Sequence, residues 1–301
     1  MTLRQRYHLF RAVGSDEAAE LYVARDLADD APVRVRLFFA EAFPDRTTRL
    51  AAVHQLAAAL NWHHPGAVPL RELGVAGSRL YVVTERPRGA PLRERLLSGE
   101  PMALPLAASV IAQALGVVEA ALAAGLSHPG LTPDNLFLNP FGAVEVGDIG
   151  QPVPHVPSRG EPPSALYVRA LDAIAGQPAS VAAQLYSAAA LVLWLASGTP
   201  PFPGETAERI RRRHRSRLAP SLATLVPTAP PALVAVVARS LRKDPAGRPT
   251  SLAALREPLL QVAAEATWPA ALPAEPALDP RPAAPAPRRR LRLPFRRAAP
   301  R

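Results

Sequence analysis

Cysteine is absent from this 301-residue chain, and of its 35 basic residues only Lys243 is a lysine. Without cysteine the protein can form neither a disulfide bond nor a thiolate metal site. The seven histidines show no spacing typical of metal ligands. The missing lysines exclude any active site that requires a lysine ahead of Lys243.

Long hydrophobic runs are also scarce, although 49% of the residues are hydrophobic and suffice for a buried core. Residues 1–11 are polar and charged and lack the apolar run of a signal peptide, so we expect no export. The apolar stretches 104–126 and 181–196 contain polar residues such as Gln113 and Gln184. We therefore predict buried helices rather than membrane spans, and a cytoplasmic protein.

Basic charge is unevenly distributed along the chain. The net charge is +10, and residues 266–301 contribute +6 of it through eight arginines and two acidic residues. This segment is rich in proline and alanine and has little periodic apolar content. We predict that it is a disordered basic tail, separate from the folded domain.

Residues 1–86 are predicted to form a small β-rich lobe. Runs rich in β-branched and aromatic residues alternate there with turn residues. One stretch, roughly Thr47–Leu60, has apolar residues at helical spacing. The predicted strands are Tyr7–Val13, Ala19–Ala24, Val33–Phe39, Val68–Leu73 and Arg79–Glu85.

Residues 87–265 are mostly helical by their pattern and form the larger lobe. Ala107–Ala124 reads as a long helix with few charges, and Gln184–Ala196 as an apolar core helix. The expected fold class is therefore α+β, with a small β-rich N-lobe and a larger helical C-lobe.

Two short motifs follow one another in the larger lobe. Residues 128–135 read His-Pro-Gly-Leu-Thr-Pro-Asp-Asn, and Gly147-Asp148-Ile149-Gly150 comes shortly after. They resemble the catalytic and metal-binding loops of protein kinases, whose patterns are H-R-D-L-x-x-x-N and D-F-G. Residues 239–250 resemble the end of bacterial Ser/Thr kinase domains. The order of elements over residues 6–262 agrees, so the resemblance implies a two-lobed protein-kinase-like fold.

The catalytic base implied by this resemblance is missing. Gly130 stands where the family has its aspartate, Pro129 where it has the preceding arginine, and Thr132 where it has the loop lysine. A general base contributes about 10² to 10⁴ in rate, and the lysine stabilises charge on the transferred phosphate. Ordinary kinase turnover is therefore not expected.

The phosphate-binding positions are altered as well. Gly14 is the one glycine kept from the family's glycine-rich loop, and Asp16 would face a polyphosphate with negative charge. Arg36 stands at the position of the family's strand lysine. Its planar guanidinium group is a poor replacement for the compact ammonium group of a lysine. A turn glycine and an exposed strand arginine are the alternative interpretations of Gly14 and Arg36.

The glutamate that normally pairs with the strand lysine is also absent. No acidic residue lies between Asp45 and Glu72, and Gln55 is the best-aligned residue. We therefore predict that the ion pair typical of active kinases cannot form.

Other residues keep the family pattern. Thr84, Glu85 and Arg86 match the last strand and the hinge, and are candidate nucleotide-binding residues. Asn135 and Asp148 match the two magnesium ligands and supply the hard oxygen donors that Mg²⁺ prefers. The resemblance thus implies residual binding of ATP and Mg²⁺. Alternatively, Asn135 and Asp148 persist because the loop backbone needs them.

Two further positions in the larger lobe depart from the family. Leu171 stands where a glutamate would pair with Arg248, so that pair is predicted to be lost. Gln184 replaces the carboxylate that anchors the catalytic loop. The activation loop, residues 151–168, contains two serines, but Pro129 has replaced the arginine that would bind their phosphates.

Together these departures favour a catalytically inactive pseudokinase, acting as a regulatory or scaffolding module that binds protein partners in bacterial signalling. The alternative is an atypical active Ser/Thr protein kinase. It would transfer the ATP γ-phosphate to protein hydroxyls using Asp148, Asn135 and Arg36.

The basic segments suggest an anionic partner as well. We expect the tail to favour an anionic membrane at its inner face over nucleic acid. The cluster Arg209–Arg217 is alternatively a solvated helix face. The tail arginines concerned are Arg288, Arg289, Arg290, Arg292, Arg296 and Arg297.

Overall fold

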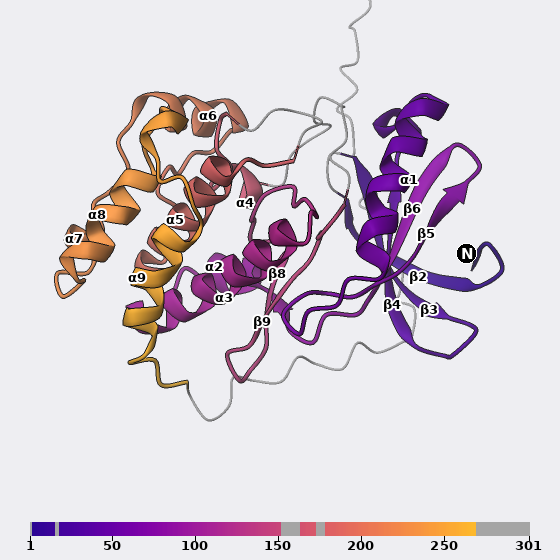
Figure 1. Cartoon of the computed structure of the whole chain (residues 1–301), viewed down its shortest axis with the longest axis horizontal. Helices are drawn as coiled ribbons and strands as arrows, with labels where there is room; N and C mark the ends of the chain where they lie inside the picture. The colour runs from indigo at the N-terminus through magenta and orange to yellow at the C-terminus, as the bar shows by residue number, and fades with distance from the viewer. Residues whose placement is uncertain (1, 16–17, 152–162, 173–177, 269–301) are drawn as a thin grey trace, which may run out of the picture.

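The computed structural model describes residues 2–15, 18–151, 163–172 and 178–268. The chain folds into two lobes that lie side by side, a sheet with one long helix and a larger helical lobe (Figure 1). Residues 86–89 connect them, after the last strand of the sheet. This is the α+β arrangement that the sequence pattern predicts.

The smaller lobe contains a six-stranded antiparallel sheet in the order β1-β2-β3-β4-β6-β5. A two-residue turn joins β5 to β6, and Gly77 takes the positive φ of 63° that this hairpin requires. The strands are β1 (Thr2–Leu3), β2 (Tyr7–Ser15), β3 (Ala19–Asp26), β4 (Pro32–Phe38), β5 (Leu70–Ala76) and β6 (Arg79–Glu85). The predicted strands are thus confirmed, and the short β1 is an addition.

Helix α1 (Arg46–Leu60) covers one face of this sheet, and a short 3-10 helix, η1 (Ala40–Ala42), precedes it. Asp45 caps α1 by accepting a hydrogen bond from the Thr48 backbone N–H at 2.8 Å. Leu56 packs beneath α1 with Phe38 of β4. Val35 of β4 belongs to a second cluster on the opposite face. Alternate residues of β4 thus point to opposite faces.

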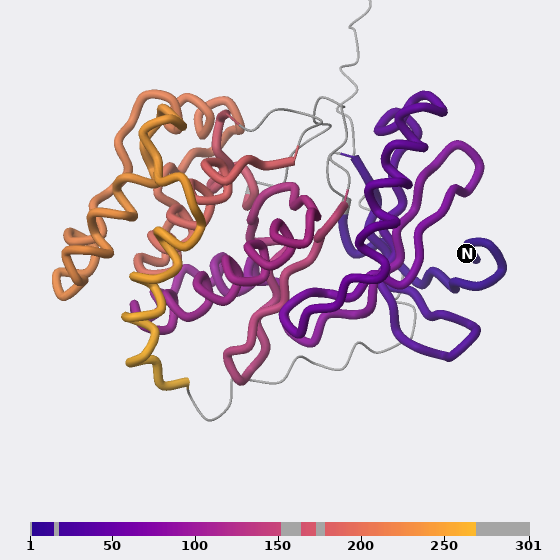
Figure 2. Tube along the Cα trace, in the orientation of Figure 1, coloured from indigo at the N-terminus to yellow at the C-terminus, as the bar shows by residue number. Residues whose placement is uncertain are grey.

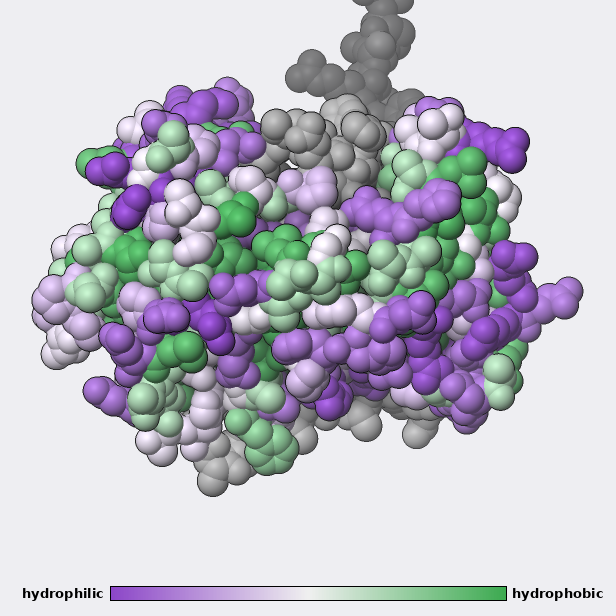
Figure 3. All heavy atoms as spheres, viewed as in Figure 1, coloured by the Kyte–Doolittle hydropathy of each residue, from purple (hydrophilic) through white to green (hydrophobic). Residues whose placement is uncertain are grey.

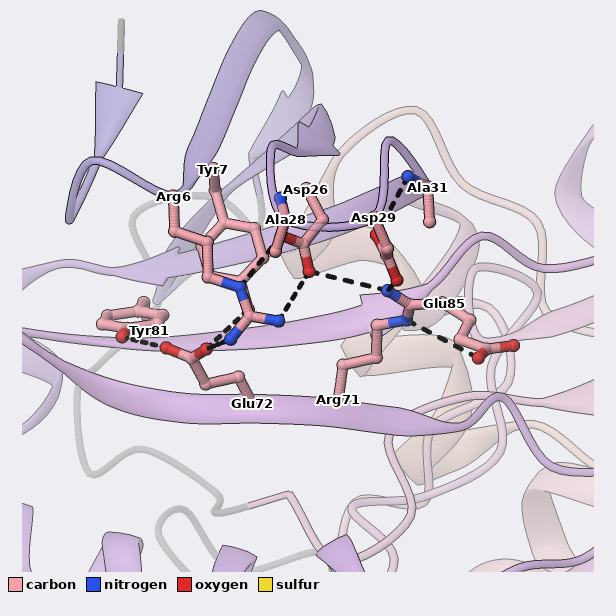
Figure 4. A network of polar contacts seen from close by, with 10 residues as sticks. All are labelled: Arg6, Tyr7, Asp26, Ala28, Asp29, Ala31, Arg71, Glu72, Tyr81 and Glu85. Carbon is pink, nitrogen blue, oxygen red and sulfur yellow. Dashed lines mark hydrogen bonds and ion pairs between the residues drawn. The ribbon is translucent and has the colours of Figure 1, made fainter.

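Polar side chains connect distant strands of the sheet around Tyr7 and Tyr81 (Figure 4), which belong to the cluster on the face away from α1. The Arg6 guanidinium donates to both oxygens of buried Asp26, at 2.9 and 2.8 Å, and to Glu72 at 2.8 Å. Glu72 also accepts from the hydroxyls of Tyr7 and Tyr81, each at 2.6 Å. Because Glu72 lies on β5, these bonds join it to the segment that begins β2, at the far end of the sheet order.

The larger lobe is built around helices α3 and α5, and α9 packs along α3 (Figure 2). Residues 183–196 of α5 are all buried, which makes it the centre of the lobe. The helices are α2 (Leu92–Leu97), α3 (Leu104–Ala123), α4 (Pro163–Leu166), α5 (Val181–Ser197), α6 (Ala207–Ser216), α7 (Leu222–Leu225), α8 (Pro231–Ser240), η2 (Pro245–Gly247) and α9 (Ala253–Ala263).

A small sheet, β7 (Ala90–Pro91), β8 (Leu136–Leu138) and β9 (Val144–Val146), lies where the lobes meet. Within the described residues, α3 is the one helix that is long and apolar enough to cross a membrane, and 56% of its apolar window is buried in the fold. Both apolar stretches thus form core helices, as predicted.

Candidate functional site

The loop 128–135 runs from the end of α3 to β8 at the junction of the lobes. His128 is fully buried, and its Nε2 lies 3.2 Å from the Gly147 carbonyl oxygen. Its Nδ1 accepts from the Gly130 backbone N–H at 3.2 Å. These contacts fit a neutral imidazole protonated on Nε2, and burial lowers the pKa of His128 below its ordinary value.

The Gln184 side chain of α5 holds this loop in place through hydrogen bonds. Its side-chain oxygen accepts from the Leu131 backbone N–H at 3.1 Å. Its Nε2 donates to His128 Nδ1 at 3.1 Å and to the His128 carbonyl oxygen at 3.3 Å. An amide supplies both the acceptor and the donors needed here, whereas an ionised carboxylate would supply acceptors alone.

At the position of the missing base, Gly130 has a backbone φ of +124°. A Cβ placed on it would lie 3.6 Å from the Ala179 Cβ, which is ordinary contact. Space is therefore available for a side chain, but this backbone conformation disfavours any residue except glycine.

The two candidate metal ligands lie close together, Asn135 at the end of this loop and Asp148 beside it. Asn135 Nδ2 is 3.4 Å from Asp148 Oδ2 and donates to the Gly130 carbonyl oxygen at 2.9 Å. Asn135 Oδ1 accepts from the Thr132 backbone N–H at 2.9 Å. Asp148 has a positive φ of 62°, which is strained for a non-glycine residue. Within the described residues, no three His, Asp or Glu side chains cluster as a metal site.

Arg36 crosses from β4 to these residues. Its guanidinium lies 3.4 Å from Asp148 Oδ1 and donates to Gln151 Oε1 at 2.9 Å. Both partners of the ion pair are mostly buried, with 18% and 26% of their side chains exposed. The arginine at the strand-lysine position thus neutralises the carboxylate at the metal position.

Gln55 of α1 also contacts the larger lobe, at Ser127 and Gln151. Its Nε2 donates to Ser127 Oγ at 2.6 Å and to the Gln151 carbonyl oxygen at 3.4 Å. In the family, α1 carries the glutamate that pairs with the strand lysine. Here the Gln55 side-chain amide joins this helix to the larger lobe instead. Gly150, with a φ of +69°, lets α1 approach closely, because a Cβ there would lie 2.5 Å from the Ala59 Cβ.

The other nucleotide-binding candidates lie in strands β2 and β6 and directly after β6. A Cβ on Gly14 would meet no atom within 4 Å. Thr84 pairs with Arg34 across the sheet. Glu85 and Arg86 line a separate cavity of about 360 Å³ with Trp62 and other residues, and neither Arg36 nor Asp148 belongs to its lining.

Sequence reasoning missed two residues at the junction of the lobes, Arg34 and Phe137. The Arg34 guanidinium carbon lies 5.0 Å from the centroid of the Phe137 ring, so β4 of the smaller lobe contacts β8 of the larger lobe. A signal was present, because Arg34 is two residues before Arg36 and therefore lies on the same strand face.

The prediction that Arg248 loses its acidic partner is wrong. Buried Arg248 pairs with Asp172, its two terminal nitrogens lying 2.7 and 3.1 Å from the carboxylate oxygens. Leu171 is instead 43% exposed. Ala170-Leu171-Asp172 occupies the place assigned to residues 169–171, so the sequence alignment was displaced by one residue.

The basic cluster forms helix α6, where hydrophilic side chains gather on the surface (Figure 3). Arg212, Arg215 and Arg217 are exposed there, and Leu218 beyond the helix is 91% exposed. Of the activation-loop serines, Ser164 is buried and donates to Asp134 at 2.6 Å. Residue 158 and the basic tail from residue 269 lie outside the described residues.

Comparison with known proteins identifies bacterial relatives, although no family model matches the chain. It is 25% identical over 246 residues to the Ser/Thr protein kinase PknE of Mycobacterium tuberculosis, covering 80% of this chain and 43% of that protein. It is 22% identical over 247 residues to PrkC of Bacillus subtilis, covering 80% and 38%. The chain thus spans less than half the length of these relatives.

Solved structures agree with the sequence comparison. The kinase domain of Mycobacterium tuberculosis PknI superposes with a TM-score of 0.66 at 19% identity, covering 87% of this chain and 98% of that domain. The predicted two-lobed kinase fold is therefore confirmed. The chain therefore has the protein-kinase fold, and its relatives in sequence are bacterial Ser/Thr protein kinases of the eukaryotic-like family.

Proposed function

We propose that this chain is a catalytically inactive pseudokinase domain that acts as a regulatory or scaffolding module. The observation that carries the proposal is Gly130, which offers no side chain to accept a hydroxyl proton at the position of the base. Its φ of +124° opposes the simple return of an aspartate.

The surroundings of Gly130 support the same proposal. No lysine is available at Arg36 or Thr132, so two positive groups that would stabilise the transferred phosphate are missing or changed. Asp148 already has Arg36 as its counterion. Because such groups act together in phosphoryl transfer, losing several leaves little of the rate enhancement.

Incubation of the purified chain with labelled ATP, Mg²⁺ and a general protein substrate tests this proposal. We expect no label transfer above the level of a heat-inactivated sample. Transfer by the wild-type chain that disappears in Asp148→Asn would contradict the proposal.

The alternative is an atypical active Ser/Thr protein kinase, and one observation favours it. Arg36, Asn135 and Asp148 do converge in one place, as phosphate and metal binding would require. The labelling experiment separates the two functions, because the alternative predicts transfer that depends on all three residues.

We also propose that anionic membrane lipids are a partner of the basic tail. Exposed arginines on α6, with Leu218 beside them, provide a second surface of the same charge. Sedimentation with vesicles containing phosphatidylserine at low salt should retain the chain, and removal of residues 269–301 should weaken retention. Equal retention of both forms, or none, would contradict this proposal.

A further inference from the structure

Strand β4 presents two arginines to the larger lobe. Val33 and Val35 are buried in the core of the sheet. Arg34 and Arg36, which alternate with them, lie on the opposite face of the strand. Each of these arginines contacts a residue of the larger lobe.

The contact between Arg34 and Phe137 lies next to the connection between the lobes. Arg34 is opposite Thr84 of β6, the strand that leads into the connection. Phe137 is opposite Pro91 of β7, the strand that follows it. A cation held 5.0 Å above this ring occupies the space where a flat base would stack on Phe137.

The second contact concerns the metal and phosphate positions. Arginine stays protonated at all ordinary pH values, so Arg36 neutralises Asp148 permanently. Asn135 uses both ends of its amide within the loop. Mg²⁺ would therefore find one carboxylate that already has a counterion, and one amide oxygen that already accepts a hydrogen bond. These residues do not fit a magnesium site well.

We propose that Arg34 and Arg36 are built-in occupants of the nucleotide cleft. Arg34 takes the place of the base, and Arg36 takes the place of the metal and phosphates. Together they connect the two lobes in the absence of a nucleotide and prevent Mg·ATP from binding. This goes beyond the proposed inactivity, because a kinase fold that has lost catalysis can still bind ATP.

Nucleotide binding provides the first test. We would measure the affinity for a fluorescent trinitrophenyl derivative of ATP, with and without Mg²⁺, in the wild type, Arg34→Ala and Arg34→Ala/Arg36→Lys. The double variant restores the residue types of the family's V-A-I-K strand. Arg25→Ala is the control, because Arg25 pairs with Asp30 at the surface of the same lobe.

We expect the wild type and the control to bind at least ten-fold more weakly than the double variant, with Arg34→Ala between them. Wild-type binding as tight as that of the double variant would overturn the proposal. So would a folded double variant that binds no better than the wild type. Neither result bears on phosphate transfer, so the proposed function would stand or fall separately.

The link between the lobes provides the second test. In a double-mutant cycle of Arg34→Ala and Phe137→Leu, we expect a coupling of about two- to five-fold in the unfolding equilibrium constant. The matched cycle uses Phe141→Leu, because the Phe141 side chain is 79% exposed, and should be additive. Additivity in the Phe137 cycle would contradict the proposed contact even if the first test fails through misfolding.

Discussion

At the scale of single residues, buried polar side chains hold the motif loop although its family residues have changed. Gln184 makes three hydrogen bonds to the loop and is fully buried. An unpaired polar group in such a place costs about 1–3 kcal/mol. The loop therefore keeps its shape through its contacts with α5, independently of the residue at the base position.

We expect Gln184→Leu to lower the free energy of unfolding by about 2–3 kcal/mol, because the Leu131 N–H loses its acceptor and His128 loses a donor. Gln184→Glu should lose at least as much, because a buried carboxylate would face the Nδ1 and the carbonyl oxygen of His128 without a hydrogen to donate. Urea denaturation at pH 7 measures both. Equal stability of the wild type and Gln184→Leu would show that these hydrogen bonds make no net contribution to the free energy of unfolding.

The pair between Arg248 and Asp172 gives a second prediction at this scale. Arg248 is 2% exposed, so Asp172→Ala should cost about 3 kcal/mol by leaving its charge uncompensated. Leu171→Ala is the neighbouring control, and should change stability by less than about 1 kcal/mol because Leu171 is half-exposed. Thermal unfolding of the two variants compares them directly. A larger loss of stability for Leu171→Ala would instead support the predicted alignment, in which Leu171 stands at the position that faces Arg248.

At the scale of elements, the small sheet depends on side chains as well as on strand pairing. Glu72 of β5 accepts from Arg6, Tyr7 and Tyr81, and these contacts cover one face of the lobe. Burial and the neighbouring carboxylate raise the pKa of Tyr81 to about 12, so its hydroxyl remains a donor at neutral pH.

We expect Glu72→Ala to destabilise the protein by about 2 kcal/mol, because both tyrosine hydroxyls lose a charged acceptor. Glu94→Ala, at an exposed position on α2, should change stability by less than about 0.5 kcal/mol. Hydrogen exchange should show the Glu72→Ala effect mainly in β2 and β5. Uniform loss of protection across both lobes would argue against a local role in closing the sheet.

At the scale of the whole molecule, buried histidines make stability depend on pH. Burial is the main cause that lowers the pKa of His128, and it lowers that of His214 to about 4. His214 is 1% exposed, lies 2.8 Å from the Tyr186 hydroxyl and is disfavoured as a cation by nearby Lys243. Both histidines are thus neutral in the folded protein at pH 7.

Stability should therefore fall as pH drops from about 7 to 5. The unfolded chain binds protons near pH 6.5 while the folded chain resists them, and His214 alone then costs about 2 kcal/mol at pH 5. Denaturation curves at the two pH values measure this fall. His214→Gln should reduce the pH dependence, whereas His63→Gln, at an exposed position, should not. An unchanged pH dependence in His214→Gln would contradict the assignment of this loss of stability to His214.

The sequence by itself determined the fold class, the order of the elements and the absence of the kinase base and lysines. These follow from local quantities, namely hydrophobic period, turn residues and the identity of each motif residue. The residues at the base and strand-lysine positions, Gly130 and Arg36, are therefore recognisable from the sequence alone. The helix limits of α3 and α5 were also close to those predicted.

Only the tertiary structure decided which side chains meet. It paired Arg248 with Asp172 rather than losing that pair, placed Arg34 over Phe137, and turned Gln55 toward Ser127. Such contacts join residues far apart in the chain, and a shift of one position exchanges a buried side chain for an exposed one. The sequence pattern lacks this precision, because distance and orientation between two elements are fixed only when their cores pack together.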